Sequence, residues 1–197
     1  MVVFLNRHSN NGCGKRKWDS ISSAVEERAA RSGQPLIVDE PGPDPLPALR
    51  EWISKGETVF AAAGGDGSVH ALCNALMNLD KISRDQVVLG AIGLGSSNDF
   101  HKPYSDQRFI GDVPARIDFT DAVPHNIGAV EYVDAKGDVL REHFIINASF
   151  GVLAEGNDLF NRGDAVINWL KHRWVNGTIT YAALKTMLTY KRYNAEL

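Results

Sequence analysis

The sequence predicts an α/β protein with an open, mostly parallel sheet that carries helices on both faces. Two observations support this fold class. Short apolar runs alternate with helical patterns over the first 120 residues or so, and these runs are apolar throughout instead of at every second position. A third observation is that the alternation of strand and helix patterns ends after Val123, where two longer strand patterns follow each other directly.

Four short apolar runs are predicted to be the strands of this sheet, at residues 1–6, 35–39, 58–63 and 86–92. Helices are predicted between them, because apolar residues recur there at spacings of three and four. The residues that mark these helices are Trp18, Ile21 and Val25 for a helix that begins near Lys17, Leu46, Leu49 and Ile53 for the next, and Val69, Leu72, Cys73, Leu76 and Leu79 for a helix beyond Gly67.

The chain after Val123 predicts a second, β-rich domain. Strands are expected over 126–133 and 139–149, joined by a turn at 134–138, and residues 192–197 resemble the start of another strand. Two helical patterns lie between, marked by Val166, Ile167, Leu170 and Trp174 and by Ile179, Ala183, Leu184, Met187 and Leu188. A lone hairpin offers little sheet to cover two helices. We therefore expect one domain over 1–123 and a second over 124–197 that is truncated.

Composition excludes several classes of protein. The 197 residues are 44% hydrophobic and 23% charged with a net charge of -3, which is typical of a globular protein and not of collagen or a disordered tail. The near-neutral balance gives no electrostatic case for nucleic-acid binding. Cys13 and Cys73 are the only cysteines and form no metal-binding pattern. With no long apolar run and no signal-peptide pattern, we expect a cytosolic protein whose membrane contact is peripheral.

Three glycine-containing loops each follow a predicted strand, at residues 9–14, 64–68 and 93–99. Ligands of open parallel sheets bind at the carboxyl ends of the strands, so these loops are expected to form one joint site. Glycine lets backbone N–H groups approach phosphate oxygens, and the helix beyond Gly67 would direct its positive end there. All three loops fail the G-x-G-x-x-G dinucleotide pattern, and residues 9–16 fail the P-loop pattern.

Four segments resemble one known family, in family order. Residues 64–68 (GGDGS) resemble the GGDGT signature shared by diacylglycerol kinases, sphingosine kinases and NAD kinases, and residues 89–100 (LGAIGLGSSNDF) are similar to a segment characteristic of the diacylglycerol kinase catalytic domain. Residues 5–14 resemble the family's opening segment more loosely, and residues 144–151 (FIINASFG) resemble a later strand. The chain is therefore identified as a member of the diacylglycerol kinase catalytic domain family.

Some residues depart from the family pattern. Arg7 stands in place of a proline, His101 in place of an alanine and Ser68 in place of a threonine. The carboxylates Asp39 and Glu40 stand where relatives often carry a threonine near the nucleotide. Because a carboxylate at that place would repel phosphates, the nucleotide contact there is in doubt.

The resemblance implies a lipid kinase that transfers the γ-phosphate of ATP to a lipid hydroxyl such as that of diacylglycerol, with Mg²⁺, at the cytosolic face of a membrane. It implies that Asp66 is catalytic, either by orienting the acceptor hydroxyl or by joining a Mg²⁺–water network; from spacing alone, Asp66 equally fits a helix cap. The implied nucleotide-binding residues are Asn6, Ser9, Gly12, Gly64, Gly65, Gly67, Ser68, Gly95, Ser96, Asn98 and Asp99. Metal ligands are not assigned.

Alternatives remain open at this point. In the family, the second domain is a β-sandwich from which the chain returns with further acidic residues, and the chain up to Leu197 holds no such return. A truncated or inactive nucleotide-binding module is therefore one alternative, and a kinase for a sphingoid base or NAD is another, against which residues 98–100 argue. The expected partners are ATP and a lipid at a membrane surface, with no nucleic acid. The oligomeric state is open, a homodimer being one alternative.

A basic cluster of Lys15, Arg16 and Lys17 also has two interpretations. Such a cluster is more often a solvated helix start, and the alternative is that it attracts an anionic lipid or a phosphate.

Overall fold

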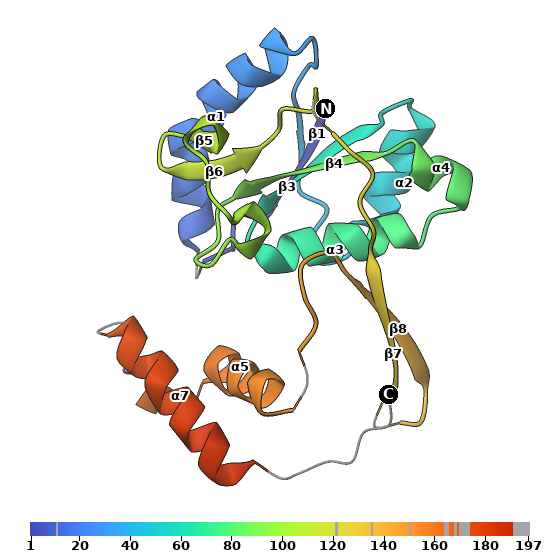
Figure 1. Cartoon of the computed structure of the whole chain (residues 1–197). Coiled ribbons are helices and arrows are strands. Elements are labelled where there is room, and N and C mark those ends of the chain that lie inside the picture. The colour runs from blue at the N-terminus through green and yellow to red at the C-terminus, as the bar shows by residue number, and fades with distance from the viewer. Residues whose placement is uncertain are drawn as a thin grey trace. The chain divides into compact units, whose positions relative to one another are not determined.

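A six-stranded sheet in the order β2-β1-β3-β4-β6-β5 lies at the centre of residues 1–146 (Figure 1). The structure is a computed structural model that describes residues 1–10, 12–120, 122–134, 136–149, 151–163, 166–167, 169 and 174–190. The strands are β1 (Val2–Leu5), β2 (Ile37–Asp39), β3 (Val59–Gly64), β4 (Val88–Gly93), β5 (Phe109–Ile110) and β6 (Val113–Arg116). Strands β2, β1, β3 and β4 are parallel, whereas β6 pairs antiparallel with both β4 and β5. The predicted α/β fold with a mostly parallel sheet is confirmed.

Helices cover both faces of this sheet, because the side chains of each strand alternate between two cores. Val3 and Leu5 of β1 pack with Trp18 of α1 on one face, while Phe4 packs with Leu72 of α3 on the other. The helices of this unit are α1 (Cys13–Arg31), α2 (Leu46–Ser54), α3 (Asp66–Met77) and α4 (Lys81–Asp85). A strand buried on both faces must be apolar throughout, which explains the sequence of β1.

Several boundaries differ from those predicted. Helix α1 begins at Cys13 instead of near Lys17, because Gly12 ends the preceding loop with a φ of 85°, in the left-handed region that glycine adopts readily. Helix α3 begins at Asp66 instead of beyond Gly67. Helix α4 and strands β5 and β6 were not predicted from the sequence.

A hairpin of β7 (Gly128–Val133) and β8 (Val139–Phe144) follows the sheet. Its register runs from Gly128 opposite Phe144 to Val133 opposite Val139, so both strands are shorter than predicted. The chain divides into compact units at 146/147, and this division groups the hairpin with the first unit. The domain boundary expected at 123/124 stays a prediction.

The second unit contains α5 (Val152–Arg162), which was not predicted, and α7 (Val175–Thr189), which matches the second helical pattern. The helix expected around Val166–Trp174 lies partly outside the described residues, and the strand start expected at 192–197 lies wholly outside them. Among the helices of the described residues, none combines the length and the apolar character that crossing a bilayer requires.

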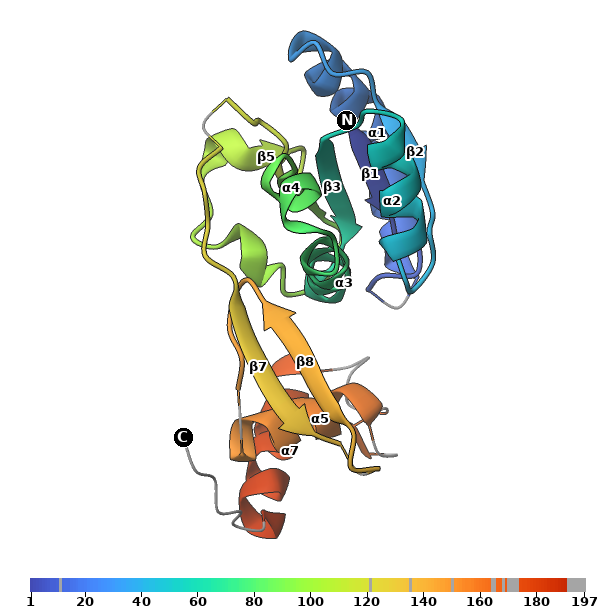
Figure 2. The ribbon, with the colours of Figure 1, turned by 90° about the vertical axis from the view of Figure 1, so that its right-hand side faces the viewer.

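Asn74 on α3 binds the end of β8 through two reciprocal hydrogen bonds. Its Nδ2 donates to the carbonyl oxygen of His143 at 3.0 Å, and the backbone N–H of His143 donates to its Oδ1 at 2.9 Å. Figure 2 shows this end of β8 beside α3. The Asn74 amide thus pairs with His143 as a residue of a neighbouring strand would.

We expect Asn74→Ala to release this end of β8. Loss of both bonds leaves the N–H and C=O of His143 unpaired, which lowers the free energy of unfolding by about 1–2 kcal/mol. Amide hydrogen exchange should accelerate at His143, and Asn74→Asp, which retains the acceptor but not the donor, should give an intermediate rate. An unchanged rate at His143 in the alanine variant would contradict this role.

Candidate functional site

The sheet has a topological switch point between β1 and β3. From β1 the chain goes through α1 to β2 on one side, and then returns through α2 to β3 on the other side of β1. Ligands of open α/β sheets bind at such a switch point, outside the carboxyl ends of the strands. The first loop (residues 6–14) follows β1, the second loop (64–68) follows β3, and the third loop (93–100) follows β4. The predicted meeting of the three loops is therefore built into the topology.

The second and third loops are joined through their backbones. The carbonyl oxygen of Gly64 accepts hydrogen bonds from the N–H groups of Leu94 at 2.8 Å and Gly95 at 3.2 Å. A Cβ atom at Gly95 would lie 2.5 Å from the Cα atom of Gly65, so a side chain cannot be accommodated there. Close packing of one loop on the other therefore requires glycine at position 95, while a Cβ atom at Gly65 would lie 3.3 Å from the Cα atom of Gly95.

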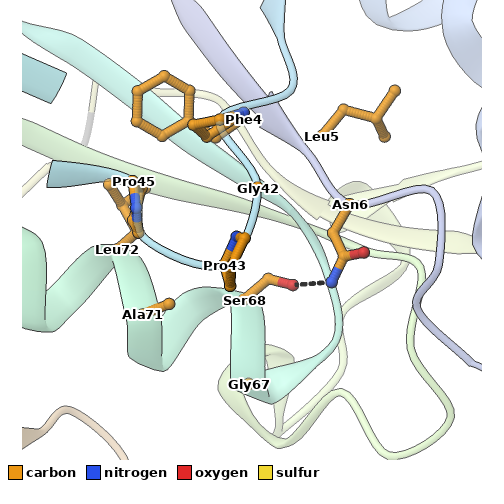
Figure 3. Close-up of a pocket in the computed structure, with 11 residues that line it drawn as sticks. Phe4, Leu5, Asn6, Gly42, Pro43, Pro45, Gly67, Ser68, Ala71 and Leu72 are labelled. Atoms are coloured by element: carbon orange, nitrogen blue, oxygen red, sulfur yellow. Dashed lines mark hydrogen bonds between the residues drawn. The ribbon is translucent and has the colours of Figure 1, made fainter. Parts of the chain in front are cut away.

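The first loop is attached to the second by two hydrogen bonds from Asn6. Its backbone N–H donates to the carbonyl oxygen of Ala63 at 2.8 Å, and its Nδ2 donates to Ser68 Oγ at 3.1 Å (Figure 3). Ser9 is buried in this loop, and its Oγ lies where a Cβ of Gly14 would be. Within the described residues, the buried Ser9 Oγ has no hydrogen-bond partner, which is unusual for a buried hydroxyl group.

Asp66 is the first residue of α3, and Gly65 occupies the capping position, so Asp66 is not the helix cap that its spacing also allowed. Its Oδ1 accepts a hydrogen bond from the backbone N–H of Phe100 at 3.2 Å, which ties the second loop to the third. A carboxylate in the first turn is favoured by the helix dipole. No donor to the other carboxylate oxygen, Oδ2, is found among the described residues, so Oδ2 is available for a ligand.

Asp99 and Lys102 form an ion pair beside Asp66. Asp99 Oδ1 accepts from Lys102 Nζ at 2.7 Å and from Ser97 Oγ at 3.1 Å. The bond from Lys102 holds the pKa of the Asp99 carboxyl below its usual value, and the same bond raises the pKa of Lys102, with the charges of Tyr104 and Asp66 adding to the effect. Lys102 therefore lies in the field of both carboxylates.

Asn98 supports the third loop from inside. It is 7% exposed and adopts the left-handed region with a φ of 52°. Its Nδ2 donates to the carbonyl oxygens of Gly93 and Gly95, both at 3.2 Å. These contacts fix the shape of the loop, and its side chain provides no capping bond to the short helix at Asp99–His101.

A pocket lies between the end of β1, the segment after β2 and the start of α3 (Figure 3). Of the predicted nucleotide-binding residues, it is lined by Asn6, Gly67 and Ser68. The remaining lining residues are Phe4, Leu5, Pro41, Gly42, Pro43, Pro45, Ala71 and Leu72. The sequence did not predict that Pro41, Pro43 and Pro45 line a pocket, although four prolines within seven residues indicate a stiff segment.

The other predicted residues lie around the loops instead of in this pocket. Gly64, Gly95, Ser9 and Asn98 are buried, Gly65, Asp66 and Asp99 are half-buried, and Gly12 and Ser96 are exposed. Within the part of the chain that the structure describes, no group of three or more His, Cys, Asp or Glu side chains could hold a metal ion.

The two carboxylates that depart from the family pattern both have partners. Asp39 Oδ2 accepts a hydrogen bond from Trp52 Nε1 at 2.7 Å, so this carboxylate has a hydrogen-bond partner within the fold. Glu40 Oε1 accepts from Arg7 Nε at 2.6 Å, and Arg7 is itself a departure from the family pattern. The two departures compensate each other, because the guanidinium offsets the negative charge that would repel a phosphate.

His101, on the short helix after Asn98, is 3% exposed. Burial and then the nearby positive charge of Arg116 lower the pKa of its imidazole from 6.5 to about 4. Arg116 also donates from Nη2 to the carbonyl oxygen of His101 at 3.2 Å. The imidazole is therefore neutral at pH 7 and serves to pack the third loop.

A comparison with protein-family models shows which family this chain matches. The model described as the diacylglycerol kinase catalytic domain matches residues 1–118, a range that holds all three loops. A comparison with curated proteins finds no match.

We expect Gly95→Ala to lower the free energy of unfolding by about 1–3 kcal/mol, because the added methyl group would force the second and third loops apart. Gly67→Ala is the matched control: a Cβ there meets no atom within 4 Å, and alanine is the better helix former. Urea unfolding should therefore show Gly67→Ala to be as stable as the wild type or more stable. Equal stability of both variants would contradict the close contact.

We expect stability to fall between about pH 6.5 and about pH 4 because of His101. In that range the unfolded chain binds a proton that the folded protein excludes, so protonation favours unfolding. His101→Gln should reduce the loss of unfolding free energy between about pH 7 and about pH 4.5 by about 2 kcal/mol. His125→Gln, at an exposed histidine, should keep the full loss; an identical pH profile for both variants would show that His101 titrates normally.

Proposed function

Because this chain belongs to the diacylglycerol kinase catalytic domain family, and is thus a kinase-type enzyme module, we propose that it transfers the γ-phosphate of ATP to the hydroxyl group of a lipid such as diacylglycerol. The observation that carries the proposal is the joining of three glycine loops at the carboxyl edge of a parallel sheet. Nucleotide phosphates bind where such loops present backbone N–H groups.

The nucleotide is proposed to bind along the first and second loops. Gly67 is exposed, and the absence of a side chain there leaves the start of α3 open to a phosphate group. Ser9 Oγ, buried and unpartnered among the described residues, supplies a hydroxyl for a phosphate oxygen. The pocket beside Asn6, with Phe4 and the proline segment as its apolar wall, is the place we assign to the nucleoside.

Asp66 is the residue we assign to the acceptor. In the proposed reaction the lipid oxygen bonds to the γ-phosphorus, the bond from that phosphorus to the β–γ bridging oxygen breaks, and ADP leaves. The hydroxyl proton passes to the Asp66 carboxylate, whose Oδ1 is fixed by Phe100 while Oδ2 is available. Phosphoryl transfer needs mainly positioning and charge neutralisation, which a fixed carboxylate and rigid loops provide.

Mg²⁺ is the proposed cofactor. This ion usually binds one or two carboxylates together with substrate phosphates and water, and when bound it neutralises charge on the phosphate oxygens. Asp99 on the third loop would hold the ion through Oδ2, which accepts no hydrogen bond among the described residues, and Asp66 Oδ2 is then left for the acceptor hydroxyl.

A lipid acceptor requires contact with a membrane surface, which we propose to be peripheral and on the cytosolic side. Apolar side chains exposed along α7 support this contact, because exposed apolar patches mark interaction sites. They are Ile179, Leu184, Met187 and Leu188, of which Leu188 is 86% exposed.

We expect Asp66→Asn to lower turnover at least about 100-fold in an assay of labelled phosphate transfer from ATP to diacylglycerol in mixed micelles. The amide retains an oxygen that accepts the Phe100 N–H bond, so the fold is kept while the negative charge is lost. Asp85→Asn, at an exposed position on α4, is the matched control and should keep wild-type turnover.

Two results would contradict this proposal. Equal turnover of the wild type and Asp66→Asn would remove Asp66 from the reaction. ATP binding by calorimetry without any lipid phosphorylation would instead identify a nucleotide-binding module.

A further inference from the structure

The three basic residues at the start of α1 have different surroundings. Lys15 is exposed, and its Nζ pairs with Asp19 Oδ2 at 2.6 Å on the same helix. Arg16 is exposed as well. Lys17 is half-buried, and its Nζ crosses from α1 to the third loop, where it donates to the carbonyl oxygen of Gly95 at 3.0 Å. Of the three, Lys17 alone is directed at the candidate site by a contact found among the described residues.

The ammonium group of Lys17 has no carboxylate partner among the described residues. An ammonium group has three N–H donors, and the Gly95 carbonyl uses one of them. A half-buried charge without a counter-ion is costly, and an anionic ligand would lower that cost.

The position of the ammonium group limits which ligand it meets. Its acceptor Gly95 packs on Gly65 of the second loop, and Gly65 caps the helix that Asp66 begins. Lys17 itself lies on the helix that follows the first loop. The ammonium group therefore lies where the three loops meet, beside the backbone to which the proposed function brings phosphates.

We infer that Lys17 binds the phosphate chain of the nucleotide. This inference rests on the proposed function, to which it adds a cationic residue outside the glycine loops. One N–H of Lys17 holds the third loop through Gly95, and the other two donate to phosphate oxygens. The positive charge neutralises the phosphates as the γ-phosphoryl group is transferred, which is the main task in this chemistry.

The test is ATP binding measured by calorimetry, with the wild type, Lys17→Gln, Lys17→Arg and Lys15→Gln compared after each is shown to unfold cooperatively. Lys17→Gln keeps a donor for Gly95 but loses the charge. We expect it to weaken ATP affinity about 10- to 100-fold, the range of charge-assisted hydrogen bonds. The effect on AMP should be smaller, Lys17→Arg should retain most of the affinity, and Lys15→Gln should stay within about twofold.

The outcomes separate this inference from the proposed function. ATP binding that is equal in the wild type and Lys17→Gln overturns the role of Lys17 alone. A wild type that binds no ATP overturns the proposed function and this inference together. A loss that is equal for ATP and AMP, and that Lys17→Arg does not restore, overturns the charge-based role in favour of a structural one.

A second measurement needs no substitution. An amine-reactive reagent applied to the wild-type protein should label Lys17 less when inorganic triphosphate is present, and mass spectrometry can quantify each lysine. Lys15 serves as the internal control, because its ammonium group is exposed and paired with Asp19. Labelling of Lys17 that does not change with triphosphate would overturn the inference.

Discussion

The backbones of Gly65 and Gly95 pack directly on each other, and the geometry of the candidate site depends on that contact. It brings the start of α3 against the third loop, which allows the Asp66 carboxylate to accept the N–H of Phe100. The same contact places the Gly95 carbonyl within reach of Lys17 from the opposite face of the sheet. A methyl group at Gly95 would separate elements whose positions define the site.

Two of the carboxylates around the candidate site are paired with cations. Asp99 is paired with Lys102, and Glu40 is paired with Arg7. The carboxylates nearest to the loops are thus partly neutralised, and phosphate groups can approach with less repulsion than the sequence suggests. Pairs of this kind are exposed and contribute little to stability, so their main effect is on the charge that a ligand meets.

The parts of the fold that could be predicted are those that depend on local sequence. A strand buried on both faces is apolar along its length, as residues 58–63 are, and the glycine loops carry their own composition. Strand β5 has only two residues, and β6 contains Pro114, which argues against a strand in the sequence, so the pairing of β6 with the distant β4 defines them.

In the candidate site as well, the sequence could predict residues that are adjacent in the chain but not contacts between residues far apart in it. The motif predicted Asp66 and the second loop, because their residues are adjacent in the chain. The Arg7–Glu40 pair joins residues 33 positions apart, and the Lys17–Gly95 bond joins residues 78 positions apart. Only the folded chain brings such groups together, so from the sequence Arg7 and Glu40 were read as separate departures.

Helix α3 carries Asp66 at its first position and the Asn74 contact with β8 two turns later. The two residues are separated by about 12 Å along the helix axis, and a short helix behaves as a stiff rod over such a length. A displacement of the hairpin must therefore either break the Asn74–His143 bonds or carry α3 with it. The hairpin and the N-terminal end of α3 are in this way mechanically coupled through Asn74.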